Sequence, residues 1–230
     1  MRIALILSGG IGTRLGYNIP KQYIPVGGRM VITHCLRIFG DHSQIDAIWI
    51  VADERWHEEI YKQMPETVIE KFKGYVAPGA NRQRSILNGL EAVISSTSDS
   101  DSDIVIVHDA VRPLVSESLI SACVEACSRH DGVLPVLPMK DTVYWGEGEH
   151  ITSLLNRDKI YSGQAPEAFR LRKYYEANRK LIMDGIDRIN GSTEPAVMAG
   201  MDIVMIPGDE DNFKITTPAD LERFKLRIKA

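Results

Sequence analysis

The sequence predicts an α/β fold in which helices cover both faces of a mainly parallel sheet. Short β-rich runs alternate with helical patterns along the 230 residues. Two of these runs, Ile3–Leu7 and Ile104–His108, are almost continuously apolar, as expected of central strands that are covered on both sides. A composition of 44% hydrophobic and 25% charged residues matches a globular chain that can bury a real core.

The individual elements follow from the local spacing of apolar residues. Runs rich in β-branched residues predict strands at Arg2–Leu7, Ile45–Ala52, Tyr75–Ala77, Ile104–His108, Gly132–Leu137 and Ile203–Ile206. Apolar residues three and four positions apart predict helices at Val31–Phe39, Arg82–Ile94, Ser118–Arg129, Arg170–Met183 and Pro218–Ile228. Ligands of open α/β sheets bind outside the carboxyl ends of the strands, so chemistry is expected there.

The helix–strand alternation lapses between Asp141 and Gln164. Thr142–Trp145 and His150–Leu154 are typical of two short antiparallel strands around the turn Gly146-Glu147-Gly148. We therefore expect an arm at about residues 139–164 that projects from the sheet and either dimerises or covers a neighbouring site. No convincing linker divides the chain, so residues 1–230 are expected to form a single domain.

Charge and hydropathy exclude several classes of partner. The net charge is −4 and no long basic stripe is present, so no nucleic acid polymer is expected as a partner. No apolar run approaches the roughly 20 residues needed to cross a bilayer, and no basic leader precedes the first strand. The three cysteines form no C-x-x-C pair, which suits a reducing compartment. We expect a soluble, cytoplasmic protein without a membrane partner.

The strongest local signal is LSGGIGTRLG, Leu7 to Gly16, directly after the first expected strand. Glycines let successive main-chain N–H groups approach an anion closely. The run is neither a Walker A loop nor a dinucleotide fingerprint, because it lacks Gly-Lys-Ser/Thr and has Leu15 in place of the third glycine. Arg14 and Lys21 follow the glycines, and such cations can neutralise the charge on a reacting triphosphate. The alternative is a tight turn with solvated cations.

The second signal is Asp109, which ends the expected strand IVIVHD and precedes Arg112. Its position predicts a carboxylate at the ligand-facing edge of the sheet. Carboxylate oxygens suit Mg²⁺, which is commonly held by one or two carboxylates and by substrate phosphates. The alternative is a capping residue at a turn.

Seven motifs in order along the chain, LSGGIGTR, PKQY, APGANRQRSILNGL, HDAVRP, KDTV, QAPEAF and NFKITTPADL, resemble the cytidylyltransferases that act on polyol phosphates. The resemblance implies a Rossmann-like nucleotidyltransferase fold with a projecting β-arm, a homodimer, and Mg²⁺ as cofactor. It also implies the reaction, in which CTP and a polyol phosphate give a CDP-polyol and pyrophosphate. Two branches share the pattern, with 2-C-methyl-D-erythritol 4-phosphate or D-ribitol 5-phosphate as substrate, and the motifs leave them nearly level.

The resemblance implies a role for each matching position. The residues that stabilise the crowded phosphates would be Arg14, Lys21 and Lys214. Those that line the triphosphate loop would be Gly10 and Gly12, and those that hold the cytosine and ribose would be Ser8, Gly9, Gly79 and Ser85. The metal ligand would be Asp109. The polyol phosphate would be bound by Arg112, Thr142 and Arg157, the last two from the arm of a partner subunit.

Each position also has a structural alternative. Thr142 could be an ordinary strand residue, Arg157 and Lys214 solvated charges, and Ser85 the start of a helix whose solvated face carries Arg82 and Arg84.

The chain departs from the pattern in several places, and two of them bear on base recognition. Ala80 stands where many relatives of the methylerythritol type have an acidic residue, and Ala165 where they have threonine. These substitutions leave the base preference less defined than the phosphate chemistry, and they motivate a non-catalytic nucleotide-binding relative as one alternative. A sugar-1-phosphate nucleotidyltransferase, which resembles the chain in its glycine loop, is another.

Overall fold

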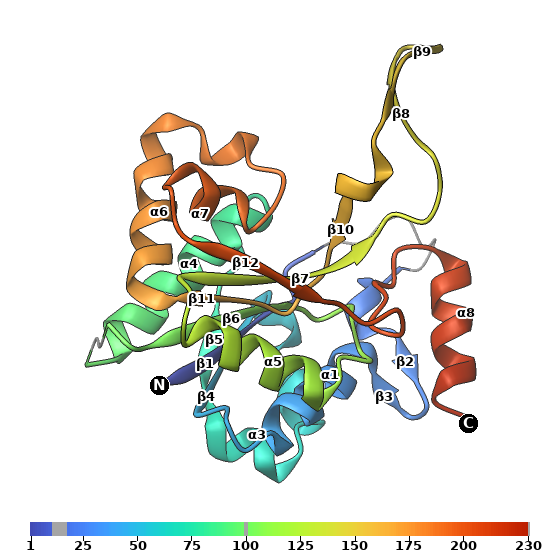
Figure 1. Ribbon diagram of the computed structural model, residues 1–230. Coiled ribbons are helices and arrows are strands. Elements are labelled where there is room, and N and C mark those ends of the chain that lie inside the picture. Colours follow the sequence, from blue (N-terminus) through green and yellow to red (C-terminus); the bar gives the residue numbers. More distant parts are fainter. Residues whose placement is uncertain (11–17, 99–100, 230) are drawn as a thin grey trace.

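A central sheet organises the structure, a computed structural model that describes residues 1–10, 18–98 and 101–229 (Figure 1). In the described residues the sheet has eight strands in the order β10-β7-β11-β6-β1-β4-β5, with β12 paired to β7. The strand bounds are β1 Arg2–Leu7, β4 Ala47–Val51, β5 Phe72–Val76, β6 Ile104–Asp109, β7 Gly132–Pro138, β10 Tyr161–Gly163, β11 Glu167–Arg170 and β12 Ile203–Pro207.

The pairings within the sheet are mainly parallel at its centre, as the sequence predicts. Strand β1 lies between β4 and β6 and is parallel to both, and β4 is parallel to β5. Strand β11 is antiparallel to both of its neighbours, β6 and β7. The sequence did not reveal β11 or β10, because runs of four and three residues carry too little periodicity.

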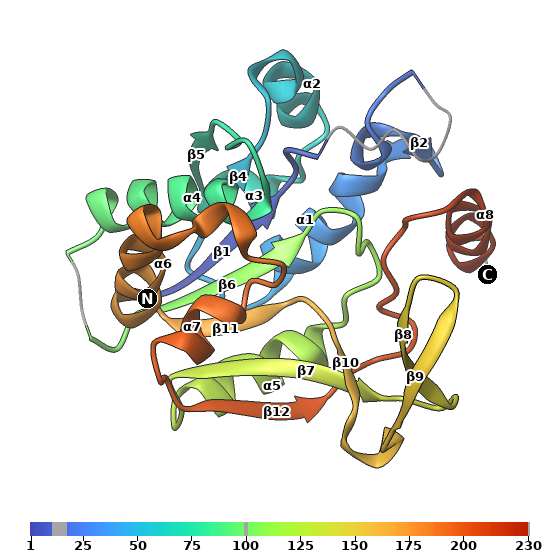
Figure 2. The same ribbon diagram turned by 90° about the horizontal axis from the view of Figure 1, so that it is seen from above.

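Helices cover both faces of the sheet (Figure 2). One apolar cluster joins the sheet to α1 Val31–Asp41, α2 His57–Lys62, α3 Glu66–Lys71 and α5 Glu117–Cys127. A second cluster on the opposite face joins it to α4 Arg82–Ser96, α6 Leu171–Asp184 and α7 Glu194–Met198. The five predicted helices and six predicted strands are all present with ends shifted by a few residues, whereas the short helices α2, α3 and α7 were missed.

A small substructure beside the sheet combines residues from near both ends of the chain. It contains η2 Lys21–Tyr23, the hairpin of β2 Pro25–Val26 and β3 Arg29–Met30, and α8 Pro218–Arg227. A third apolar cluster packs these pieces around Val31, Ile215 and Phe224. A capping box between Thr217 and Asp220 starts α8.

The predicted arm is a hairpin of β8 Val143–Glu147 and β9 His150–Leu155. Gly148, with φ of 58°, supplies the left-handed residue of its turn. The hairpin projects away from the sheet (Figure 1). Its large apolar side chains are exposed, and Trp145 has 59% of its surface accessible. The remaining short elements are the turns η3 Glu54–Trp56, η4 Arg157–Lys159 and η5 Ile186–Arg188.

None of the helices in the described part of the chain is long and apolar enough to cross a membrane. The three cysteines are buried thiols. Burial raises the pKa of the Cys35 thiol to about 12, so this side chain behaves as a small apolar core residue.

Candidate active site

The carboxyl ends of β1 and β6 meet at one edge of the sheet, because Leu7 and Asp109 are partners in the parallel register. Beside them a pocket of about 620 Å³ opens. Its described lining consists of Leu7, Ser8, Gly9, Gly10, Lys21, Gln22, Gly79, Ala80, Asn81, Arg82, Ser85, Asp109, Val111 and Lys214. Ligands of open α/β sheets bind at such an edge, so this pocket is the candidate active site.

Eight of the thirteen residues predicted from the sequence line this one pocket. They are Ser8, Gly9, Gly10, Lys21, Gly79, Ser85, Asp109 and Lys214. Gly12 and Arg14 lie outside the described residues. The pocket therefore joins segments from near both ends of the chain with the middle of the sheet.

Close main-chain packing explains two of the glycines. A Cβ atom at Gly9 would lie 2.4 Å from Cβ of Pro78, and one at Gly79 would lie 2.5 Å from Cβ of Arg84. The Gly79 N–H donates to Oγ of Ser85 over 3.0 Å, so the loop that carries Gly79 is held against the first turn of α4. Gly10 also lines the pocket, but a Cβ atom there would meet no described atom within 4 Å. Gly9 and Gly79 thus allow close packing against Pro78 and Arg84, whereas the missing side chain of Gly10 leaves the pocket open.

Gln22 fixes the chain after β1 and was not singled out from the sequence. Its buried amide donates to the carbonyl oxygens of Ser8 and Gly10, each over 2.7 Å. The Tyr23 hydroxyl donates to the same Ser8 carbonyl over 2.9 Å. The motif PKQY was noted for its lysine, but its glutamine and tyrosine are what hold the main chain of Ser8 and Gly10.

Lys21 lies beside the C-terminal segment of the chain. Its ammonium group donates to the carbonyl oxygen of Ile215 over 2.9 Å. The neighbouring Lys214 donates to Oδ2 of Asp109, also over 2.9 Å. Two lysines separated by almost the whole sequence therefore line the same pocket.

Asp109 is surrounded by cations. Arg82 donates to its Oδ1 through Nε and Nη2, over 3.1 and 3.0 Å, and Nε of Arg112 lies 3.8 Å from Oδ2. Burial disfavours the ionised form of Asp109, but Arg82 and Lys214 outweigh it and hold the pKa of this carboxyl well below its usual range. The sequence-based alternative that placed Arg82 on a solvated helix face is wrong, since two-thirds of its side chain is covered.

Glu167, at the start of β11, is a second buried carboxylate that sequence reasoning missed. It accepts hydrogen bonds from the hydroxyls of Ser192 and Thr193, and its Oε1 lies 3.8 Å from Nη2 of Arg82. A glutamate in a four-residue strand has no distinctive spacing, so only the QAPEAF motif marked its position.

Arg112 lies next to the pocket with only 12% of its side chain exposed. It donates through Nη1 to the carbonyl oxygen of Asn212 over 2.6 Å. Its Nε has no hydrogen-bond partner among the described residues. Burial lowers the pKa of Arg112, and Asp109 opposes that shift. Nε is covered and lies 3.8 Å from Oδ2 of Asp109, so the charge of Arg112 acts mainly on that carboxylate.

Thr142 and Arg157 are on the arm and do not line the pocket in this chain. Both are exposed, and they line a separate hollow of about 500 Å³ with Leu154 and its neighbours. Arg157 donates to the carbonyl oxygen of Lys140 over 3.0 Å. Their predicted role at the polyol phosphate therefore needs the arm of another subunit.

A single carboxylate is available for a metal ion at the pocket. Asp109 is the one acidic side chain among the described lining residues, and the described residues contain no group of three potential metal ligands. One carboxylate is enough for Mg²⁺ only when phosphate oxygens supply further ligands. Asp109 is therefore the one described pocket residue that could ligate a magnesium ion, most of whose ligands would have to come from substrate phosphates.

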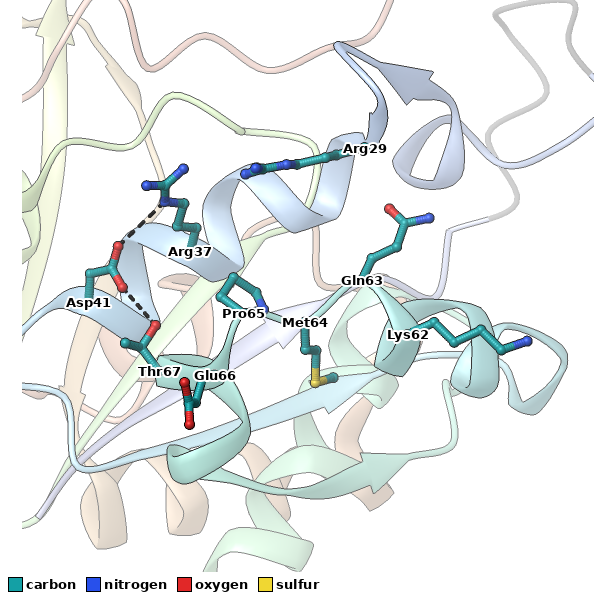
Figure 3. A pocket seen from close by; sticks show the side chains of 9 residues that line it. All are labelled: Arg29, Arg37, Asp41, Lys62, Gln63, Met64, Pro65, Glu66 and Thr67. Carbon is teal, nitrogen blue, oxygen red and sulfur yellow. Dashed lines mark hydrogen bonds and ion pairs between the residues drawn. The ribbon is translucent and has the colours of Figure 1, made fainter.

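A second pocket, of about 410 Å³, lies between α1 and the α2–α3 segment (Figure 3). Its charged groups are mixed in sign, and Asp41 is already paired with Arg37 at 3.6 Å and with the Thr67 hydroxyl at 2.6 Å. It contains none of the predicted site residues. The strand-end pocket remains the better candidate.

Gly9 and Gly10 after a central parallel strand, with two lysines and an aspartate around the same pocket, are typical of an α/β protein that binds a nucleotide. Comparison with known proteins agrees, because the model of the 2-C-methyl-D-erythritol 4-phosphate cytidylyltransferase (IspD) family matches residues 2–229. The chain belongs to this family.

Individual relatives carry two different names. A 2-C-methyl-D-erythritol 4-phosphate cytidylyltransferase of Geotalea uraniireducens is 32% identical over 228 residues, covering 96% of this chain and 94% of that one. A ribitol-5-phosphate cytidylyltransferase of Lactiplantibacillus plantarum is 29% identical over 222 residues, covering 96% and 95%. The chain spans about half the length of other relatives, the bifunctional IspD/IspF enzymes of Desulfotalea psychrophila and Paramagnetospirillum magneticum.

Solved structures share the fold. The crystal structure of 4-diphosphocytidyl-2C-methyl-D-erythritol synthase from Anaerococcus prevotii has a TM-score of 0.81 and 26% identity, covering all of this chain and 96% of that one. The predicted fold class is confirmed.

Proposed function

We propose that this protein transfers CMP from CTP to a polyol phosphate and releases pyrophosphate. Family membership supports the class of reaction. The observation that carries the proposal is the meeting of Lys21, Lys214 and Asp109 around one pocket beside the glycine turn. Two cations on a strand-end pocket suit a reaction in which negative charge crowds around phosphorus.

The proposed chemistry is an in-line displacement. A phosphate oxygen of the polyol phosphate forms a bond to the α-phosphorus of CTP while the bond from that phosphorus to pyrophosphate breaks. The attacking oxygen is already ionised near neutral pH, so the reaction needs no general base from the protein. Positioning and neutralisation of charge are the tasks left to Lys21 and Lys214.

The two substrates would occupy different ends of the pocket. Gly9, Gly10, Gly79 and Ser85, which line the pocket, would face the nucleotide. The end near Asp109 would receive the polyol phosphate, where Lys214 lines the pocket and Arg112 adds positive charge behind Asp109. Thr142 and Arg157 would complete that end from the arm of a second subunit in a homodimer.

We propose that Mg²⁺ accompanies CTP and neutralises part of the triphosphate charge, with Asp109 as its ligand from the protein. Asp109→Asn should then raise the Mg²⁺ concentration that gives half-maximal activity. The same half-maximal concentration in both proteins would remove this role from Asp109.

The two branch names among the relatives leave the polyol open, so the deciding experiment compares substrates. Purified protein would be assayed for pyrophosphate release with CTP and, in parallel, 2-C-methyl-D-erythritol 4-phosphate and D-ribitol 5-phosphate. We expect turnover with one of them at least tenfold above the other. CTP binding without turnover of either would favour the non-catalytic alternative suggested by Ala80 and Ala165, and a preference for UTP or GTP with a hexose phosphate would contradict the proposal.

A further inference from the structure

Glu167 is a buried carboxylate for which the proposed reaction has no use. It begins β11 and is paired with Val107 of β6, two residues before Asp109. Only 6% of its surface is exposed. Removing a charge from water costs several kcal/mol unless partners compensate, so the partners of Glu167 should indicate its role.

The partners of Glu167 lie on two sides. On one side, the Ser192 hydroxyl donates to Oε1 and the Thr193 hydroxyl donates to Oε2, the latter over 2.7 Å. On the other side, Oε1 lies 3.8 Å from Nη2 of Arg82. Burial raises the pKa of Glu167, and Arg82 and the hydroxyl donors act against that rise.

Arg82 connects Glu167 with the pocket. The Nη2 atom that lies near Glu167 also donates to Oδ1 of Asp109 over 3.0 Å, and Nε donates to the same oxygen over 3.1 Å. A guanidinium between two carboxylates has less freedom to rotate than one anchored at a single oxygen. The other oxygen of Asp109 accepts from Lys214, so the orientation of Asp109 reaches the proposed catalytic lysine.

We propose that Glu167 is a positioning residue, which through Arg82 keeps the Asp109 carboxylate oriented toward Lys214. The consequence for catalysis rests on the proposed function. The competing explanation is that Glu167 only fastens the Ser192–Thr193 segment to the sheet. Positioning through Arg82 needs the negative charge of Glu167. Fastening the Ser192–Thr193 segment needs only oxygen atoms that accept from the two hydroxyls.

A matched pair of variants separates them. Glu167→Gln removes the charge and keeps an acceptor, whereas Thr193→Val keeps the charge and removes one hydroxyl bond. We expect Glu167→Gln to lower kcat roughly tenfold. CTP affinity should not weaken, because the site becomes more positive by one charge. Thr193→Val should lower Tm and leave kcat within about twofold. Equal losses of Tm in both variants with kcat unchanged would overturn the proposal.

The link through Arg82 is tested by a double-mutant cycle. If Glu167 acts through Arg82, Glu167→Gln should change kcat by less than about twofold in an Arg82→Ala background. Independent effects that multiply in the double variant would show that Glu167 acts by another route and would overturn the proposal.

A spectroscopic measurement tests the positioning without any turnover. The ¹⁵Nε–H signal of Arg82, assigned by its absence in Arg82→Lys, should exchange with solvent at least about tenfold faster in Glu167→Gln than in the unmodified protein. Glu167→Asp, which keeps the charge on a shorter stem, provides a second variant and should show an intermediate rate. Unchanged exchange in both would overturn the positioning role. Faster exchange in a protein that transfers no CMP would refute the proposed function alone.

Discussion

Lys214 donates a 2.9 Å hydrogen bond to Oδ2 of Asp109 across 105 positions of the sequence. The bond joins the segment that precedes α8 to the carboxyl end of β6, and so closes one side of the pocket. Asp109 is nearly covered, whereas 37% of the Lys214 side chain remains exposed toward the pocket. The lysine can therefore keep its carboxylate partner and still reach an anionic ligand.

Replacing Lys214 tests its role at the reacting phosphates. Lys214→Met keeps much of the stem and removes the charge, so kcat should fall by about 100- to 1,000-fold if Lys214 stabilises the transition state. Lys214→Arg, which retains a cation, should recover part of this loss. Steady-state kinetics would measure both variants, with thermal unfolding as the control. A Met variant within threefold of the original kcat would remove Lys214 from the reaction.

Lys21 should act on turnover more than on nucleotide binding. Lys21→Ala is expected to cost roughly 2 to 4 kcal/mol of transition-state stabilisation while the Kd for CTP changes much less. The same result is predicted from the sequence for Arg14→Ala, although Arg14 lies outside the described residues. Single-turnover rates and calorimetric CTP titrations would be compared. Parallel losses in rate and affinity would mean that these cations only hold the ground state.

Two adjacent glycines should respond differently to a methyl group. Gly9→Ala places Cβ 2.4 Å from Cβ of Pro78 and should lower the free energy of unfolding by about 1 to 3 kcal/mol. Gly10→Ala meets no described atom within 4 Å, so the fold should tolerate it while CTP affinity falls by roughly tenfold as the pocket fills. Urea unfolding and CTP titration of both variants would check this contrast. Unchanged CTP affinity in Gly10→Ala would place the nucleotide elsewhere.

Asp220 should give α8 a pH-dependent anchor. Burial opposes ionisation of Asp220, but the donors of Thr216 and Thr217 outweigh it and lower the pKa to about 2. The ordinary value is about 3.9, so this stabilisation is complete above about pH 5 and is lost as the pH falls through 2. We expect Asp220→Asn to cost about 1 kcal/mol at pH 7, since the group is partly exposed.

Urea unfolding of both proteins at pH 7 and pH 3 measures this difference. It should be roughly halved at pH 3, where the unfolded chain has already bound most of its proton. A difference that stays constant between the two pH values would show that the capping box owes nothing to the charge of Asp220.

The proposed homodimer, in which the arm of one subunit reaches the site of the other, predicts complementation between subunits. A subunit with Lys21→Ala and one with Arg157→Ala should each be inactive as homodimers, but a hybrid has one site with Lys21 from one subunit and Arg157 from the other. Random pairing on coexpression should then restore about a quarter of full activity. The control pair Lys21→Ala with Lys214→Met has no intact site in any hybrid. No recovery in the first pair, with dimers present, would place Arg157 outside the site.

Much of this fold could be predicted because its signals are local. Continuous apolar runs marked β1 and β6, and helical spacing marked α1 and α4, since central strands and amphipathic helices carry their burial pattern in a few consecutive residues. Short elements such as β11 were missed, because pairing with β6 and β7 stabilises them more than their own composition does.

By itself, the sequence determined the order of the long strands and helices, the projecting arm and eight of the residues that line the pocket. Glycines, a lysine after them and an acid at a strand end are signals that residue type and local spacing reveal without any structure. Only the tertiary structure decided how the charges pair: Asp109 is held by Arg82 and Lys214, and Arg82 lies near Glu167. Such pairing depends on distances of about 3 to 4 Å between side chains far apart in sequence, and spacing along a chain carries no measure of those distances.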